Sequence, residues 1–73
     1  MVLAELKKGE IAKISEINID EIPLKLLEMG CLPGNSVSLV QIAPFGCPLY
    51  FVINDSHVAI RLETAKQIEI SLL

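Results

Sequence analysis

The stretch from Leu24 to Val40, LKLLEMGCLPGNSVSLV, constrains the fold more than any other part of the chain, because it contains a helix end, a tight turn and a strand start. Gly30 follows the last expected helical residue, Met29, at the position where a left-handed backbone is needed and glycine adopts it without steric cost. We expect Cys31 to pack back against Leu26 in the last helical turn. The helix therefore ends at a defined point.

The four residues from Leu32 to Asn35 match a type II turn. Pro33 supplies the fixed φ of the second position, and Gly34 supplies the positive φ of the third. After this turn, the spacing of apolar residues changes from helical to strand-like. We therefore assign Gly30, Pro33 and Gly34 a structural role.

Length and composition predict one small domain with an aliphatic core. The 73 residues are expected to form a single domain, residues 1–73, and a chain of this length buries only about 60 % of its unfolded surface. Apolar residues make up 52 % of the chain but aromatic residues only 4 %, so the core must be built from Ile, Leu and Val. An aliphatic surplus on the surface would suit a homo-oligomer or a docking face.

Charge and hydropathy argue against several kinds of partner. The net charge is −3 and the six Lys and Arg residues are scattered, which argues against nucleic acid and anionic membrane as direct ligands. The longest apolar run, Leu49 to Ile53, is far shorter than the ~18 residues of a membrane span, so we expect no direct membrane insertion. Charged residues near the start interrupt any signal peptide, and two cysteines imply no disulfide scaffold. We expect a cytoplasmic protein.

The hydrophobic pattern predicts about five short strands and one short helix. The helix is expected from about Pro23 to Met29. The strands are expected at residues 10–17, 36–43, 49–53, 57–61 and 67–72. These counts favour a mainly β fold: a small SH3-like, partly open barrel with the helix inserted after the first strand. An OB-like barrel is the runner-up.

Two of these strands have unusual patterns. In residues 10–17, Ile11 and Ile17 share one face while Ile14 lies on the other, so we expect a bent or bulged strand. Residues 49–53 are apolar on both faces, which predicts a central strand covered on both sides.

The strand at residues 36–43 is expected to change face. It begins with Val37 and Leu39 facing inward and then presents Val40 and Ile42. Small, strongly bent barrels use such strands to pass from one sheet layer to the other.

Candidate catalytic groups are sparse. His57 is the only histidine, and nothing near it in the sequence supplies the partners of a nucleophilic or acid–base arrangement. Each glycine is explained as a turn residue, so no phosphate-binding loop is expected. We predict that the protein is not an enzyme.

A soft-metal site would have to use Cys31, Cys47 and His57, which lie far apart in the sequence. Packing on the helix end is a sufficient explanation for Cys31. Cys47 lies in a loop between Gly46 and Pro48 and is the better candidate for a reactive or metal-binding thiol, although an inert role is favoured for both cysteines. No cofactor is predicted, and weak binding of Fe²⁺, Mn²⁺ or Zn²⁺ is the alternative.

Several short motifs occur in a defined order and spacing over nearly the full length of the chain. They are Leu3, Leu6, Lys8-Gly9-Glu10, Leu27-Glu28-Met29-Gly30-Cys31, Pro33-Gly34, Val37, Ala43-Pro44, Gly46, Pro48, Ala59-Ile60-Arg61, Ala65, Ile68 and Ile70. This pattern resembles the FeoA family, small cytosolic proteins associated with bacterial ferrous iron uptake. The same module occurs at the C-terminus of iron- and manganese-dependent repressors.

The resemblance implies an SH3-like barrel that serves as an accessory to FeoB, a membrane permease with a cytosolic GTP-binding domain. Such a protein would bind and modulate its partner and would not move iron itself. The sequence departs from the family pattern at Cys47, where an Asp is usual, and at Cys31, where a leucine is usual. The change at Cys47 weakens any transfer of an acidic contact to this loop.

The residues least explained by folding are the expected partner contacts: Lys25, Glu28, Pro44, Phe45, Gly46 and Cys47. Phe45 would be either a lid over one open end of the barrel or an interface anchor. Glu28 opposes the helix dipole, and either a local pair with Lys25 or Arg61 or a partner contact would explain it.

Two other functions compete with the permease accessory. The first is a small transition-metal-binding or metal-delivery protein, which would use the soft ligands named above. The second is a self-associating interaction module related to the C-terminal domain of metal-dependent repressors, which would use the aliphatic surplus.

Overall fold

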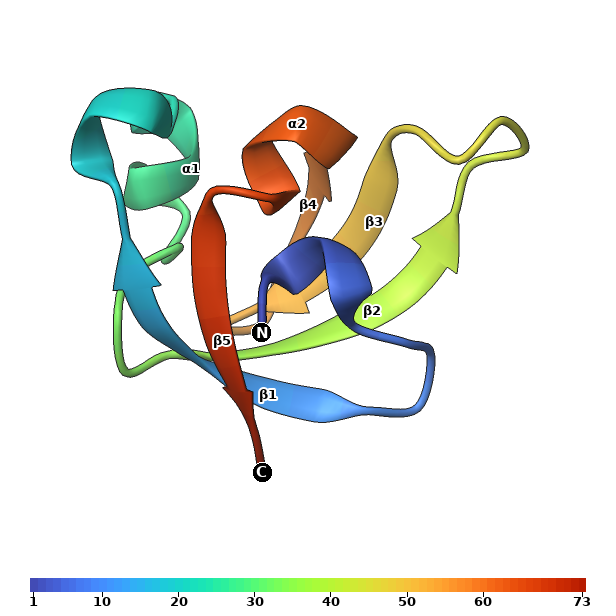
Figure 1. Ribbon diagram of the computed structural model, residues 1–73, viewed down its shortest axis with the longest axis horizontal. Helices are drawn as coiled ribbons and strands as arrows, with labels where there is room; N and C mark the ends of the chain where they lie inside the picture. Colours follow the sequence, from blue (N-terminus) through green and yellow to red (C-terminus); the bar gives the residue numbers. More distant parts are fainter.

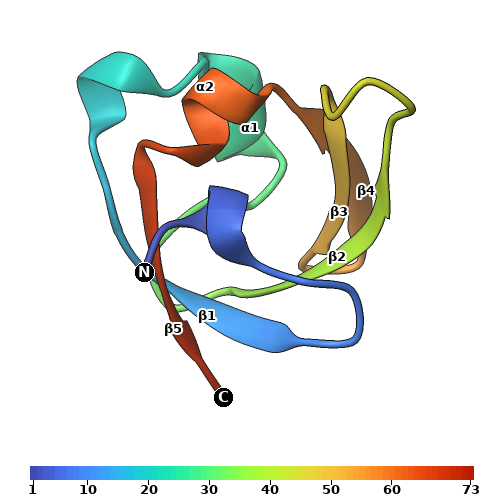
Figure 2. The ribbon, with the colours of Figure 1, turned by 45° about the vertical axis from the view of Figure 1, so that its right-hand side comes forward.

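Five antiparallel strands form one sheet in the computed structural model, which describes all residues from Met1 to Leu73. The sheet has the strand order β4-β3-β2-β1-β5 and curls into a partly open barrel, with the short helices lying across its opening (Figures 1 and 2). The strands are β1 (Ile11–Ile17), β2 (Ser36–Ile42), β3 (Leu49–Ile53), β4 (Ser56–Ile60) and β5 (Ile68–Leu72). The predicted mainly β class is confirmed.

Four short helical segments connect or precede the strands. They are η1 (Leu3–Glu5), η2 (Ile19–Glu21), α1 (Leu24–Glu28) and α2 (Leu62–Ala65). The helix α1 follows β1, as predicted, and Pro23 is its N-cap residue.

The end of α1 follows from its backbone hydrogen bonds. The N–H of Cys31 donates to the carbonyl of Leu26 at 3.0 Å, and the N–H of Gly30 donates to the carbonyl of Leu27 at 3.2 Å. This is the Schellman pattern, and it requires the positive φ of +101° that Gly30 adopts. Cys31 and Leu26 are both buried in the core.

The strands β1 and β2 take part in two irregular pairings. The register of β1 against β5 shifts between Ile14 and Glu16, which accounts for the broken alternation in the sequence. The register of β2 against β3 shifts between Leu39 and Gln41. Both bulges bend the sheet and help it to close into a barrel.

The expectation that Val40 and Ile42 turn inward is wrong. They remain 45 % and 46 % exposed. The reason is that β1 pairs with β2 only as far as Ser38, so the second half of β2 has β3 as its only neighbouring strand. This half extends toward the loop beyond it and away from the core (Figure 1).

The expectation that β3 is covered on both faces is also wrong. Leu49, Phe51 and Ile53 are buried, but Tyr50 is 41 % exposed and Val52 is half-buried. The outward face of the sheet has no second layer over it (Figure 2). The apolar residues on this face are therefore available for contacts.

The core consists entirely of apolar side chains. Its 17 residues include a single aromatic residue, Phe51, as the aliphatic composition predicts. Leu3 from η1 and Ala65 from α2 close the interior and are fully buried. The start of the chain also covers the edge of β5, because the N–H of Ile70 donates to the carbonyl of Met1 at 2.8 Å.

Candidate partner-binding surfaces

The loop between β2 and β3 has a defined backbone. The N–H of Gly46 donates to the carbonyl of Ala43 at 2.8 Å, and the N–H of Ala43 donates to the carbonyl of Pro48 at 3.1 Å. Cys47 links the loop to α2, because its Sγ accepts a hydrogen bond from the N–H of Leu62 at 3.4 Å. These bonds and the flanking prolines limit the conformations of the loop.

Phe45 lies at the tip of this loop and is 98 % exposed. It covers neither end of the barrel, so the expected alternative of a lid is wrong. An exposed phenylalanine on an ordered loop keeps its full apolar surface in water, which is unfavourable unless a partner covers it. The neighbouring Pro44 is exposed as well.

The exposed side of α1 carries the other expected contacts. Lys25 and Glu28 both face solvent, and neither forms an ion pair, since the only ion pair in the protein joins the Met1 amino group to Glu69. The expected pairing of Glu28 with Lys25 or Arg61 is therefore not formed. Beside them Leu24 is 68 % exposed, an exposed apolar side chain that the sequence pattern did not single out.

The structure separates these two groups of residues. The helix α1 and the loop at residues 43–48 lie at opposite ends of the long axis of the molecule (Figure 1). A small partner patch could contact one group, and only a partner that spans the barrel could contact both.

Residues from two other turns lie close to Gly30 at the end of α1. Asn35 Nδ2 donates a hydrogen bond to the carbonyl of Gly30 at 2.7 Å. A Cβ atom added to Gly30 would lie 3.2 Å from the Cβ of Asn54, in the turn between β3 and β4. Gly34 has φ of +97° and open space around it. Gly30 is thus constrained by both its backbone and its neighbours.

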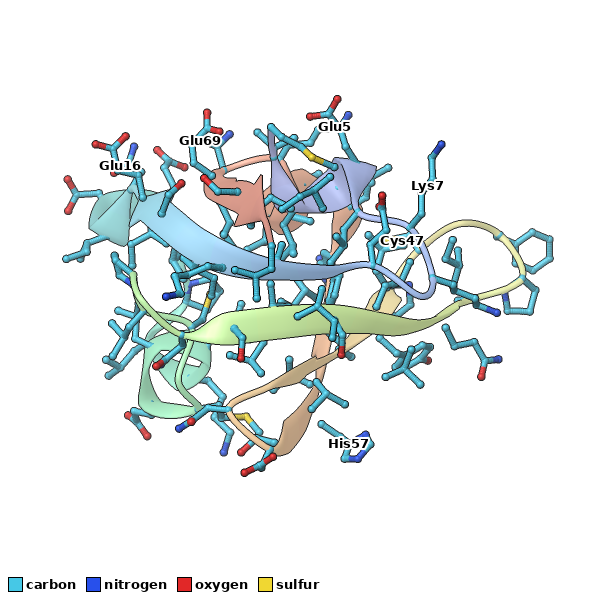
Figure 3. All side chains as sticks on the ribbon, turned by 90° about the horizontal axis from the view of Figure 1, so that it is seen from below. Glu5, Lys7, Glu16, Cys47, His57 and Glu69 are labelled. Atoms are coloured by element: carbon cyan, nitrogen blue, oxygen red, sulfur yellow. The ribbon has the colours of Figure 1, made fainter.

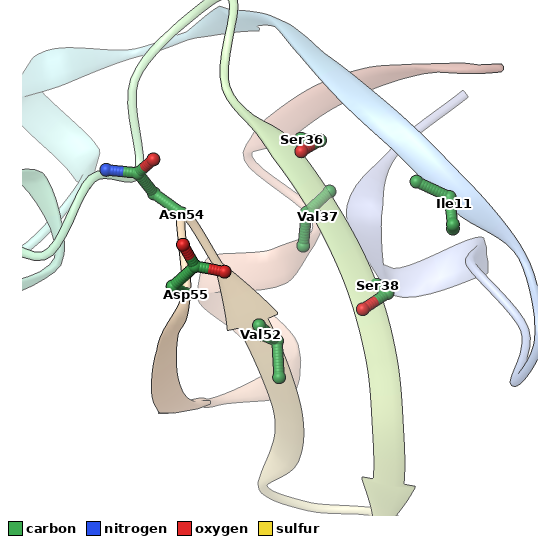
Figure 4. Close-up of a pocket in the computed structure, with 7 residues that line it drawn as sticks. All are labelled: Ile11, Ser36, Val37, Ser38, Val52, Asn54 and Asp55. Carbon is green, nitrogen blue, oxygen red and sulfur yellow. The ribbon is translucent and has the colours of Figure 1, made fainter.

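An open groove crosses the outward face of the sheet (Figure 4). Ile11, Ser38 and Val52 line it from three adjacent strands, and Asn54 and Asp55 lie at one end. Its polar groups are serine hydroxyls, one amide and one carboxylate. This set lacks the paired titratable groups that acid–base or nucleophilic chemistry needs.

The candidate metal ligands lie in three different environments. Cys31 is buried, and burial raises the pKa of its thiol from 9.0 to about 11. Cys47 is exposed in its loop, and His57 is exposed on β4 in a different part of the molecule (Figure 3). No group of three or more His, Cys, Asp or Glu side chains is placed to hold a metal ion.

None of the helices is both long and apolar enough to cross a lipid bilayer.

Comparisons with known proteins agree on one family. A model of the FeoA domain matches residues 1–72. The Fe(2+) transport protein A/Fe(2+) transporter FeoB fusion protein of Porphyromonas gingivalis is 38 % identical over 74 residues, which cover 100 % of this chain and 9 % of the fusion protein. The chain thus corresponds to a small part of that relative.

Solved structures support the same assignment. Iron(II) transport protein A from Clostridium thermocellum is 31 % identical, with a TM-score of 0.87 and coverage of 100 % of this chain and 46 % of that chain. FeoA from Stenotrophomonas maltophilia, crystallised with zinc and described as an SH3 domain protein, is 28 % identical, with a TM-score of 0.80 and coverage of 97 % and 89 %. The predicted SH3-like barrel is confirmed.

Proposed function

Because the chain belongs to the FeoA family, we propose that it is a non-enzymatic accessory protein of ferrous iron transport. In this proposal it acts in the cytoplasm, binds the cytosolic GTP-binding part of a FeoB-type permease and modulates transport. The barrel supplies no catalytic group for this role. In this proposal, the barrel contributes a surface that binds the permease.

The observation that carries the proposal is the exposure of Phe45. Large aromatic side chains dominate the binding energy of many interfaces, where they fill a pocket on the partner. Phe45 is 98 % exposed, and the backbone hydrogen bonds of its loop reduce the conformational entropy that binding would cost. We assign Phe45 as the anchor, with Pro44, Gly46 and Cys47 forming the rest of the contact.

The relative from Porphyromonas gingivalis supports the choice of partner. In that protein the region similar to this chain belongs to one polypeptide with a FeoB transporter. A covalent link gives two modules a high effective concentration, which favours modules that act together. We propose that the region formed by this chain associates with a FeoB-type transporter in the same way.

The helix α1 provides a second contact in the proposal. Glu28 lies unpaired in the last turn, where the helix dipole disfavours a negative charge. A cationic group on the partner would offset this cost. Since α1 and the loop lie at opposite ends of the long axis of the molecule, Lys25 and Glu28 would meet a different part of the permease from Phe45.

The test is a titration of ¹⁵N-labelled protein with the cytosolic domain of the FeoB permease, with and without guanine nucleotide. We expect the amide signals around Phe45 to shift. The Phe45→Ala variant should bind at least about tenfold more weakly, as for an interface anchor. Lys25→Glu should change the affinity only about two- to fivefold, as for an exposed charge at the rim.

Ile19→Ala is the matched control, because Ile19 is another strongly exposed apolar residue but lies outside both contacts. The affinity of this variant for the permease domain should equal that of the unmodified chain. Absence of any shift at high micromolar concentrations of the permease domain would contradict the proposal. If Phe45→Ala and Ile19→Ala reduced the affinity equally, Phe45 would not be the anchor of the interface.

Zinc in the Stenotrophomonas maltophilia FeoA structure supports a second candidate, transition-metal binding. Cys47 and His57 are the exposed soft donors of this chain. Anaerobic titration with Fe²⁺, Mn²⁺ and Zn²⁺ tests this function. Unchanged affinity in the Cys47→Ser plus His57→Ala variant would rule out a site built on these two residues.

A further inference from the structure

One half of the barrel is almost free of charge. From Met29 to Asn54 the chain has no Asp, Glu, Lys or Arg, and Asp55 is the only such residue before Arg61. This part of the chain forms β2, β3 and β4. The outermost of these strands, β4, is an end strand of the sheet.

The two edges of the sheet differ in their protection. The edge of β5 is covered by the start of the chain, since Val2 forms a bridge to Glu69 and Met1 accepts a hydrogen bond from Ile70. The edge of β4 has no paired segment beyond it. Soluble proteins usually protect such an edge with charges, prolines or bulges. The strand β4, SHVAI, has none of these and pairs regularly with β3 over all five residues.

The register of β4 shows which backbone groups are free. Asn54 and Asp55 form a two-residue turn with φ of 50° and 67°, so Ile53 and Ser56 are a hydrogen-bonded pair. Hydrogen-bonded pairs alternate along an antiparallel ladder, so the N–H and C=O groups of His57 and Ala59 point away from β3. No turn or loop hydrogen bond of the protein uses these groups.

We propose that two copies of this chain associate through β4, in antiparallel orientation about a two-fold axis that passes beside Val58. In this register His57 of each copy lies opposite Ala59 of the other. All the free backbone groups of the two residues are then used, in four hydrogen bonds between the copies. The two sheets become one continuous sheet.

The charges at the ends of β4 argue for a second copy as the occupant. The same register brings Asp55, in the turn that precedes β4, toward Arg61 of the other copy, so opposite charges approach each other at both ends of the interface. Both residues are exposed, and neither forms an ion pair within the chain. The backbone of Arg61 is extended, with φ of −65° and ψ of 147°, so it continues the strand direction.

The outward face of the sheet is compatible with this pairing. Val40, Tyr50 and Ala59 line an apolar groove beside His57, and no charged side chain takes part in it. His57 lies at the border of the molecule in Figure 3. In the dimer, the His57 ring of one copy would lie next to Ala59 of the other, which joins the two grooves across the axis.

Sedimentation velocity over a dilution series tests the proposal with two charge variants. In a dimer of the Asp55→Lys variant, two cations would face each other at each end of the interface. In a dimer of the Arg61→Glu variant, two anions would face each other there. Each variant alone should therefore dimerise at least about tenfold more weakly. A one-to-one mixture restores opposite charges at both ends, and dimers should return. Lys8→Glu, in an exposed turn, has the same charge change as Arg61→Glu and should dimerise normally.

Amide hydrogen exchange gives a residue-specific second measurement. The exchange of His57 and Ala59 should slow as the protein concentration rises, while Val58, already bonded to β3, should not change. Ala59→Pro should abolish dimerisation without unfolding the protein, because it removes an N–H that the single chain does not use.

Three results would overturn the proposal. The first is a monomer at every concentration. The second is a mixture of the two folded charge variants that fails to dimerise. The third is protection of His57 and Ala59 only when the permease domain is added, which would assign the edge to a different protein.

Discussion

The thiol of Cys31 lies in the core, where desolvation raises its pKa from 9.0 to about 11. Cys47, of the same type, lies exposed in a loop. The sequence supported the packing role of Cys31 through its position after Gly30, and it supported the exposure of Cys47 through the flanking glycine and proline. For these two cysteines, the neighbouring residues in the sequence were sufficient to predict which thiol is buried and which is exposed.

The buried thiol predicts a specific loss of stability at alkaline pH. The unfolded chain releases the Cys31 proton near pH 9 and the folded chain only near pH 11, so the folded state binds more protons between these values. The free energy of unfolding should therefore fall as the pH rises through this window, by roughly 3 kcal/mol in total.

Urea unfolding at about pH 8 and at about pH 10.5 measures this loss. Cys31→Ala is the control, because it is less stable at both values but lacks the thiol that titrates. The difference in stability between the two proteins should shrink at the higher pH. A constant difference would show that Cys31 does not carry the effect.

Phe45 could not be assigned from the sequence in the same way. Its neighbours predicted a constrained loop, but whether the ring covers the barrel or points into solvent depends on where the loop lies relative to the core. The same limit applies to the ion pair expected between Glu28 and Arg61, since Arg61 approaches α1 only if the tertiary structure brings it there.

At the scale of the elements, the turn after α1 was predictable because it depends on single residues. The positions of Gly30, Pro33 and Gly34 require backbone angles that few other residue types adopt. Gly30 and Gly34 have φ of +101° and +97°. The faces of β2 and β3 were not predictable to the same degree. Apolar residues such as Val40 and Tyr50 are buried only if another layer covers them, and nothing within the strand specifies that layer.

The two glycines of this region should differ in their tolerance of a side chain. Gly34→Ala should cost about 1 kcal/mol, because the positive φ is unfavourable but the space around it is open. Gly30→Ala should cost more, roughly 2 kcal/mol or above, because the added Cβ also lies 3.2 Å from Asn54.

Denaturant unfolding of both variants measures this difference. Asn54→Gly in the background of Gly30→Ala removes the neighbouring Cβ and suits the positive φ at this position, so it should recover part of the loss. Equal costs for the two glycines would show that the contact with Asn54 is unimportant.

At the scale of the whole molecule, folding and binding use different residues. The core is formed by 17 apolar side chains, while Phe45, Lys25 and Glu28 are exposed and contribute little to it. The sequence predicted the barrel because the number and order of strands are encoded along the chain. It did not reveal that the expected contacts lie at opposite ends of the long axis of the molecule.

This separation predicts that Phe45→Ser changes binding without changing stability. Its free energy of unfolding should stay within about 0.5 kcal/mol of the original, as for most surface substitutions. Thermal unfolding measures the stability, and the permease titration measures the affinity. A large loss of stability would show that Phe45 packs on the barrel, and any loss of binding could then be a folding effect.

Tyr50 has a consequence for how the protein can be observed. The chain has no tryptophan and this is its single tyrosine, so its ultraviolet fluorescence comes almost entirely from one ring. That ring is 41 % exposed on the outward face, next to β4, and is not part of the core. The intrinsic emission should therefore respond weakly to unfolding and more strongly to whatever covers this face, so the protein carries its own optical reporter of assembly.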